Sequence, residues 1–343
     1  MGNMIVHNLV ADTFGTHIGK YSQRLRITQQ GETLAEAPLL HLQSILVTSS
    51  GVSISADALA ACSEHGIPVH FVDGTGTPYA ALYNTGLIGT IATRREQLLA
   101  YYDARGIGFT LAIAEGKIRN QATNLKYLAK TRETTAPELH QELSLRASEV
   151  MDCIALLDNI VDENLDDLRS AVMGAEGLAA KRYWEAAGLV LPEEYQWPGR
   201  VGRGAKDSLN SLLNYGYGIL YGKIEQAILL AGLDPYAGFL HADRPGKPSL
   251  VLDLIEEFRQ VAIDRLVFGL ANRHFTVHQD DKGLLTQETR RGFADKVLEH
   301  LEATVRYDGK RYPLRFVIQN QARHLASFLR GECPAYIPFK AIW

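Results

Sequence analysis

The stretch over residues 93–102, TRREQLLAYY, marks the point where the sequence changes character. Thr93 and Glu96 have the spacing of a capping box, in which two side chains satisfy free backbone N–H groups at a helix start. Strand-like segments precede this stretch, and apolar residues at helical spacing dominate after it. The sequence therefore predicts an α+β protein, with a small β-rich domain over residues 1–90 and a larger all-α domain over residues 91–343.

The first ninety residues contain short runs of branched and aromatic residues, separated by turn residues. The predicted strands are residues 4–10, 25–28, 44–48, 69–72 and 79–83. One helix over residues 56–65 interrupts them, with Ser55 as its N-cap and Gly66 just past its end. Residues 73–77 are predicted to form a hairpin loop, and because they do not open a helix we do not expect them to bind phosphate.

Helical spacing after residue 90 predicts eight helices. They cover residues 93–104, 109–130, 136–160, 165–187, 207–231, 249–270, 286–302 and 314–330. The sequence contains none of the glycine-rich or nucleophile motifs of P-loop, dinucleotide-binding or α/β-hydrolase proteins. The site must therefore be sought among individual charged side chains.

Composition narrows the class of protein. The 343 residues are 46% hydrophobic and 22% charged, with a net charge of -4. No apolar run reaches the roughly 20 residues of a membrane-spanning helix, and the N-terminus lacks the pattern of a secretory signal. Cys62, Cys153 and Cys333 lie far apart, so we expect no cysteine zinc site or disulfide framework. These features predict a cytoplasmic protein whose phosphate contacts, if any, come from local basic patches.

Glu176 is the first candidate for a ligand. It lies in the predicted helix 165–187, where Gly174 and Gly177 flank it among alanines. Glycine inside a helix costs about 0.5–1 kcal/mol relative to alanine, so this pair indicates a surface that another backbone or a ligand approaches closely. A packing seam with a glutamate at its solvent edge explains the same residues, and this helix alone favours that interpretation.

The second candidate segment begins at His241, in a turn-rich stretch before a helix that Ser249 is predicted to cap. At about 100° per residue, one face of this helix is apolar and the opposite face carries Asp253, Glu256, Glu257, Gln260 and Asp264. An acidic face of this kind is often only solvated. The adjacent histidine favours a mixed nitrogen and oxygen site suited to Mg²⁺ or Mn²⁺ over zinc. Spacing does not choose between Glu256 and Glu257, nor does it bring Glu176 close to His241.

Two basic segments and one aromatic pair are further candidates. The basic residues are Lys117, Arg119, Lys126, Lys130 and Arg132 in and after the helix 109–130, and Arg200, Arg203 and Lys206 in a glycine-rich loop. A solvated helix face and a flexible linker are the alternatives to DNA binding. Tyr217 and Tyr221 share a helix face, for which core packing is the more frequent role and a supporting hydroxyl in a DNA site the less frequent one.

At these residues the chain resembles a known family, the CRISPR-associated endonuclease that acts as integrase in spacer acquisition. The similarity is strongest over residues 173–183, 207–221, 241–259, 283–286 and 290–293, and it continues into the tail from Gln321 to Phe339. The order and spacing of these segments carry the resemblance, because none of them is decisive singly.

The resemblance implies a β-rich domain that mediates dimerisation and an all-α catalytic domain. It also implies a divalent-metal site formed by Glu176, His241 and Glu256, with Asp253 in a supporting position. The expected partners are double-stranded DNA, a second copy of the chain and a small ferredoxin-like subunit.

The chemistry so implied is phosphodiester transesterification, in which a bound Mg²⁺ or Mn²⁺ polarises a phosphate oxygen and orients a water or a DNA 3′-hydroxyl. Nearby cations, with Arg259 as a candidate DNA contact, would stabilise the developing charge. Two alternatives are a non-catalytic DNA-binding scaffold, which a chelator would not affect, and a metal-dependent hydrolase of small phosphoesters, which would not depend on DNA length.

Overall fold

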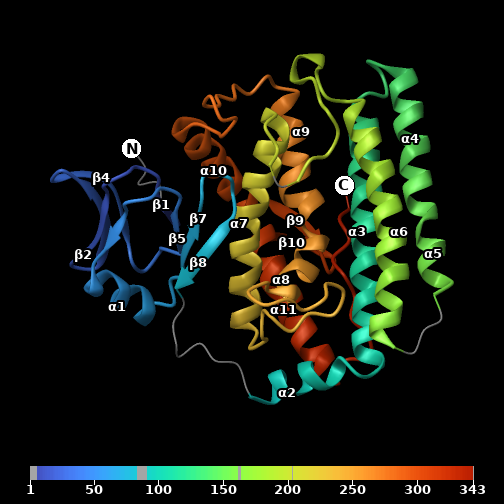
Figure 1. The fold of residues 1–343 in the computed structure, drawn as a ribbon, viewed down its shortest axis with the longest axis horizontal. Helices are drawn as coiled ribbons and strands as arrows, with labels where there is room; N and C mark the ends of the chain where they lie inside the picture. The colour runs from blue at the N-terminus through green and yellow to red at the C-terminus, as the bar shows by residue number, and fades with distance from the viewer. Residues whose placement is uncertain (1–5, 83–90, 161–163, 203, 343) are drawn as a thin grey trace.

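The computed structural model describes residues 6–82, 91–160, 164–202 and 204–342. Figure 1 shows a β-rich unit at one side of the molecule and a larger helical unit at the other. The α+β prediction is confirmed. Some predicted features lie outside the described residues: the first two residues of the strand 4–10, Tyr83, the end of the first domain at residue 90, and Arg203. The domain boundary therefore stays a prediction.

Two four-stranded sheets enclose the N-terminal core. The first has the order β1 (Asn8–Ala11), β5 (Ser44–Val47), β7 (Val69–Val72) and β8 (Pro78–Leu82), with β8 antiparallel to β7 and the others parallel. The second has the order β4 (Glu32–Pro38), β3 (Arg24–Gln29), β2 (His17–Tyr21) and β6 (Ser53–Ile54). Buried apolar residues from both sheets, such as Ile18, Leu25 and Ile45, form one cluster. Strands β2, β4 and β6 were not predicted, because they are short or carry exposed polar residues in place of a branched run.

The predicted helix and hairpin of this unit are confirmed. Helix α1 (Ala56–Glu64) begins after Ser55, whose side chain accepts a hydrogen bond from Ala58 N, and Gly66 has a positive φ of 65°. The loop between β7 and β8 packs against the helical unit at two glycines. A Cβ on Gly218 would lie 1.6 Å from the carbonyl oxygen of Gly76, so only glycine permits this approach.

The second unit is mostly helical. Its α-helices outside residues 249–271 are α2 (Ile91–Ala100), α3 (Ala104–Lys130), α4 (Pro137–Asp152), α5 (Ile154–Asp158), α6 (Leu165–Gly188), α7 (Ser208–Leu230), α10 (Gln287–Glu302) and α11 (Leu314–Leu329). A single turn of 3-10 helix, η1 (Glu193–Tyr195), follows α6. Because α2 begins at Ile91, Thr93 lies inside this helix, and the capping box predicted at its start is wrong.

The expectation of a purely α-helical second domain misses one hairpin. Strands β9 (Thr304–Tyr307) and β10 (Lys310–Pro313) pair antiparallel around Asp308 and Gly309, which both have positive φ angles. Asp-Gly is a strong signal for a two-residue hairpin turn, so the sequence contained the information. The strands are short and polar, which hid them among the helical signals.

The predicted helix 249–270 is broken into four pieces. They are α8 (Ser249–Leu254), the 3-10 turn η2 (Ile255–Glu257), the π-helical segment η3 (Gln260–Asp264) and α9 (Arg265–Ala271). Such irregular turns inside a helix often occur at functional sites. Within the described part of the chain, no helix is both long and apolar enough to span a membrane.

Lys223 of α7 connects the two units, and its removal is expected to stabilise the protein. Its ammonium donates to Ser44 Oγ at 2.6 Å and to Asn8 Oδ1 at 3.3 Å, and Ser44 also donates to Asn8 at 2.6 Å. Burial lowers the pKa of Lys223 to about 8. The cost of the buried charge is therefore present below pH 8 and disappears toward its ordinary pKa of 10.5.

We expect Lys223→Met to raise the free energy of unfolding at pH 7 by about 1–3 kcal/mol, because Ser44 and Asn8 still bond to each other. The gain should fade by pH 10. Chemical denaturation at both pH values measures it, with Lys20→Met at an exposed position as the control. A loss of stability at pH 7 would contradict the expectation.

Candidate functional site

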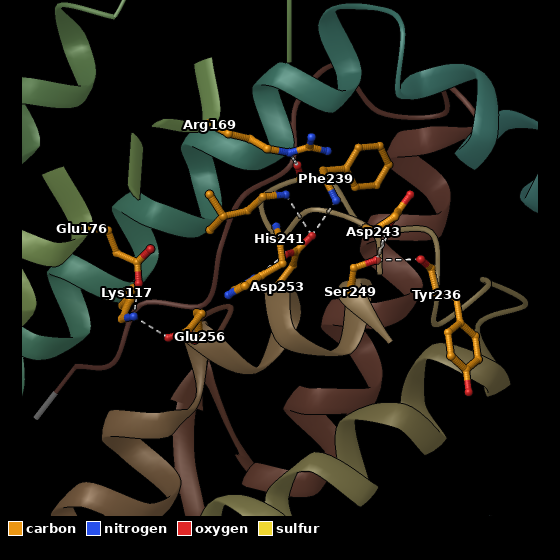
Figure 2. Close-up of polar contacts among 12 residues, drawn as sticks. Lys117, Arg169, Glu176, Tyr236, Phe239, His241, Asp243, Ser249, Asp253 and Glu256 are labelled. Carbon is orange, nitrogen blue, oxygen red and sulfur yellow. Dashed lines mark hydrogen bonds and ion pairs between the residues drawn. The ribbon is translucent and has the colours of Figure 1, made fainter. Parts of the chain in front are cut away.

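Three charged side chains meet between α3, α6 and η2 (Figure 2). The ammonium of Lys117 lies 2.6 Å from Glu256 Oε2 and donates to Glu176 Oε1. The side chains of Lys117, Glu176 and Glu256 are only 12%, 13% and 4% exposed. Arg259 pairs with the other Glu256 oxygen at 3.3 Å. The structure therefore brings Glu176 and Glu256, which are 80 positions apart, to one cation position.

Electrostatics keep this cluster charged. Burial raises the pKa of the Glu256 carboxyl, yet the charges of Arg259 and Lys117 outweigh it and hold the pKa at about 2. Burial lowers the pKa of the Lys117 ammonium, but the carboxylates of Glu256 and Glu176 raise it above its ordinary value. A buried charge of this kind is tolerated only when it is paired, so each group depends on its partners.

The surroundings of Glu176 on α6 differ from the packing seam that the sequence favoured, because the two glycines beside it do not pack against another helix. Ala175 and Ala179 are buried in the core, whereas Gly174 and Gly177 are exposed and a Cβ on either would meet no atom within 4 Å. Alanine therefore provides the helix packing. The two glycines leave open surface beside Glu176, which is not at a solvated edge but in an ion pair.

His241 is fixed by Asp253, which lies on α8. The fully buried Asp253 carboxylate accepts hydrogen bonds from the backbone N–H groups of Phe239, Leu240 and His241, at 2.6, 3.1 and 2.8 Å. It also accepts from His241 Nδ1 at 2.7 Å. Because an ionised carboxylate can only accept, Nδ1 carries the proton and Nε2 is the ring nitrogen left for a ligand. A carboxylate behind a histidine is the usual support of a metal-binding imidazole.

The remaining acids of this segment point elsewhere. Glu257 accepts hydrogen bonds from Tyr336 Oη, from Gln321 Nε2 at 2.9 Å and from Phe339 N at 2.5 Å, and burial raises its pKa to about 7. The solvated acidic face considered from the sequence is wrong, because the break of the helix at η2 and η3 turns every one of these acids inward. It also separates Glu256 from Glu257, and only Glu256 lies beside Glu176.

Asp264, the last acid of this segment, accepts hydrogen bonds from Tyr217 Oη and from Tyr183 Oη, the latter at 2.9 Å. Tyr217 is therefore engaged through its hydroxyl, and its ring lies 4.8 Å beneath the Arg259 guanidinium. Tyr221 packs against the helical core and forms no hydrogen bond with these groups in the described structure. Tyr217 thus positions Arg259, whereas the placement of Tyr221 agrees with core packing.

The predicted basic residues do not form one surface. Lys117 is buried in the ion cluster, and Arg119 on the same helix pairs with Glu115 at 2.5 Å. Arg200 donates to Asn210 at 3.0 Å and to Asn214 at 2.7 Å, which holds its loop against α7. Lys206 remains in the loop before α7, where its carbonyl accepts from Gln279. The alternative of a solvated helix face is therefore wrong for Lys117, whereas Lys126 and Lys130 farther along α3 are exposed.

The donor chemistry of the cluster fits a divalent cation, although no metal cage is preformed. Among the described residues, no three His, Cys, Asp or Glu side chains are arranged to hold a metal ion as they stand, since the Lys117 ammonium lies between the two carboxylates. Two carboxylates from different elements nevertheless converge on one cation position. His241 lies near enough to act electrostatically on Glu256, as the least of the groups that lower its pKa. Oxygen donors with one imidazole suit Mg²⁺ or Mn²⁺.

Comparisons with known proteins agree with this architecture. A family model described as CRISPR associated protein Cas1 matches residues 9–299. A CRISPR-associated endonuclease Cas1 of Archaeoglobus fulgidus is 37% identical over 335 residues, which cover 94% of this chain and 96% of the relative.

Solved structures show the same fold at lower identity. A casposase bound to integration product has a TM-score of 0.80 and 22% identity, covering 98% of this chain and 95% of that one. A Cas6-RT-Cas1–Cas2 complex has a TM-score of 0.77 and 20% identity, and the match covers 99% of this chain and 37% of that one. A TtCas1–DNA complex has a TM-score of 0.55 and 19% identity, and the match covers 92% of this chain and 91% of that one. Since the family model spans most of the sequence and the Archaeoglobus relative aligns over nearly all of it, the chain belongs to the CRISPR associated protein Cas1 family.

Proposed function

We propose that this chain is a metal-dependent DNA endonuclease and integrase that inserts short DNA fragments into a CRISPR repeat array. Family membership supports the CRISPR role, and the relatives are named as endonucleases. The observation that carries the site is the convergence of Glu176 and Glu256 on one cation position, beside a histidine that Asp253 orients.

In this proposal Glu176, Glu256 and Nε2 of His241 hold Mg²⁺ or Mn²⁺ in place of the Lys117 ammonium. The ion, when bound, would polarise a phosphate oxygen and lower the pKa of the attacking hydroxyl. Lys117 and Arg259 then lie beside the site as cations that can stabilise negative charge on the phosphate. Because Nδ1 is held by Asp253 and Nε2 is the ligand atom, His241 does not take the proton of the nucleophile.

The proposed reaction exchanges one phosphodiester bond for another. A 3′-hydroxyl oxygen of the incoming fragment loses its proton and bonds to phosphorus in the target strand. The bond from that phosphorus to the 3′-oxygen of the target breaks, and this oxygen leaves as a hydroxyl after it takes up a proton. With water in place of the 3′-hydroxyl, the same residues would cleave the strand.

The proposed partners are double-stranded DNA, a second copy of the chain and a small ferredoxin-like subunit. The structural neighbours named as a Cas1–Cas2 assembly and a Cas1–DNA complex support Cas2 and DNA. Dimerisation through the N-terminal unit and a cytoplasmic location accompany this proposal.

A half-site integration assay tests the function. A labelled fragment with a free 3′-hydroxyl and a repeat-containing plasmid are incubated with Mn²⁺ or Mg²⁺, and the joined product is measured. We expect Glu176→Gln, or a chelator with the wild-type protein, to reduce joining to background. Glu185→Gln provides the matched control, because Glu185 lies on the same helix with its side chain 58% exposed.

The scaffold alternative gives the opposite outcome. If the wild-type protein binds DNA equally well with and without chelator and yields no joined or cleaved product, the catalytic proposal is wrong. Joining that persists in Glu176→Gln would leave strand transfer in place but remove Glu176 from the metal site.

A further inference from the structure

A basic pocket lies away from the ion cluster. Its volume is about 1020 Å³, and it is formed by the C-terminal end of α3, by α9, by the end of α10 and by the hairpin β9–β10. Its charged lining consists of Arg132, Arg265, Arg273, Arg306 and Arg311, and no aspartate or glutamate lines it. We call it the arginine pocket. Five guanidinium groups around one cavity contrast with the net charge of -4 of the whole chain.

Four of these five arginines carry a positive charge that no acid of the described residues neutralises. None of Arg132, Arg273, Arg306 and Arg311 forms an ion pair with an acid in the described part of the chain. His300 also lines the pocket, and burial lowers its pKa, so it adds a hydrogen-bonding group and no charge. Like charges held together repel one another, and an anion in the pocket would remove that cost.

Structural roles account for only part of the set. Arg132 donates to Asn272 Oδ1 at 3.0 Å and to Val190 O at 3.3 Å, and Arg265 lies 4.1 Å from the ring centroid of Tyr127. By contrast, the side chains of Arg273 and Arg306 form no hydrogen bond with any described residue. Their guanidinium groups are therefore free to bind a ligand.

The arginine pocket and the ion cluster share two elements. Leu128 of the pocket follows Lys117 by eleven residues on α3, which at 100° per residue returns it to nearly the same face, roughly 15–20 Å along the helix. The chain from Glu256 through η3 to Arg265 packs beside α3 over this distance. At roughly 3.4 Å per nucleotide, the separation corresponds to about five nucleotides of a strand.

We propose that the arginine pocket binds consecutive phosphates of a nucleic-acid strand several nucleotides away from the ion cluster. This inference rests on the proposed function for the identity of the ligand as DNA. The volume lies at the upper end of the range for small-molecule sites, roughly 300–1,000 Å³, so it accommodates more than one phosphate. Arginine suits the task because its planar fork binds phosphate oxygens in pairs.

The test measures the salt dependence of DNA binding by fluorescence anisotropy, with a labelled single strand and a labelled duplex. The variant is Arg273→Gln/Arg306→Gln/Arg311→Gln. The control is Lys181→Gln/Lys282→Gln/Lys310→Gln, which removes the same charge from exposed lysines, one of them on the same hairpin. Each lost phosphate contact lowers the slope of log K against log salt by about 0.7 for a single strand and 0.9 for a duplex.

We expect the slope of the arginine variant to fall by about two to three, and that of the lysine control to stay unchanged. Replacing the same three arginines with lysine should retain most of the slope, which separates charge from misfolding. Equal slopes for the arginine variant and the control would overturn the proposal.

A free polyphosphate is the other ligand that could present consecutive phosphates to the arginine pocket. If tripolyphosphate raises the melting temperature of the wild type and not of the arginine variant, while the DNA slopes are equal, the strand assignment is overturned. The proposed function can fail separately: a reduced slope in the arginine variant would support the pocket even if no strand joining is seen with the wild type.

Discussion

Replacing Lys117 with methionine is expected to lower the free energy of unfolding by about 3–5 kcal/mol in the presence of a chelator. The ammonium is the only cation placed between Glu176 and Glu256 in the described structure, and all three side chains are nearly buried. Its removal leaves two carboxylates facing each other, with Arg259 paired to Glu256 alone. Uncompensated buried charges are among the largest single-residue costs in proteins.

Chemical denaturation measures this effect. Lys126→Met, at an exposed position on the same helix, controls for loss of a lysine. The double variant Lys117→Met/Glu256→Gln should recover part of the stability, because it removes one of the two opposed charges. If Lys117→Met and Lys126→Met have equal stability, the cluster does not depend on this ammonium.

The dependence on pH follows from the same pairing. Because Lys117 and Arg259 hold the pKa of Glu256 at about 2, below its ordinary value of 4.5, the stabilisation is fully present above pH 4.5 and is lost as the pH falls toward 2. In Lys117→Met this loss of stability at low pH should begin at a higher pH, since one of the two charges that lower the pKa of Glu256 is gone.

The parts of the fold that the sequence predicted are those with strong local patterns. Strands with branched runs, such as β5 and β7, and long amphipathic helices, such as α3 and α6, lie within a few residues of their predicted bounds. Strands β2 and β4 were missed because their stability comes from pairing with β3, not from their own composition. Such pairings depend on neighbours distant in sequence.

Only part of the candidate site could be predicted, because its geometry also depends on residues that are distant in sequence. A helical wheel placed Glu256 and Glu257 on one face, since it assumed an unbroken helix. The break at η2 follows from contacts that no local pattern contains: the C-terminal segment around Phe339 bonds to Glu257, and Lys117 reaches Glu256 from α3. The role of Lys117 as an internal counter-ion was missed because its neighbours in sequence resemble a basic helix face.

Asp253 is the residue through which stability and the proposed metal site are coupled. Asp253→Ala should lower the free energy of unfolding by about 3–6 kcal/mol, because it leaves three backbone N–H groups and His241 Nδ1 without their acceptor. Asp253→Asn keeps one acceptor oxygen and should cost less. Asp281→Ala provides the control, because Asp281 is exposed and its side chain has no hydrogen bond or ion pair with a described residue.

The two Asp253 variants separate folding from positioning. In Asp253→Asn the side-chain amide no longer provides a charged acceptor for Nδ1, so His241 loses its fixed tautomer, and Mn²⁺ binding should weaken by about 10–100-fold. Titration of Mn²⁺ followed by electron paramagnetic resonance measures this directly, without recourse to DNA joining. If Asp253→Asn folds and binds Mn²⁺ as tightly as the Asp281→Ala control, His241 is not oriented by Asp253 for a metal. The buried carboxylate would then serve only to hold the loop backbone from Phe239 to His241.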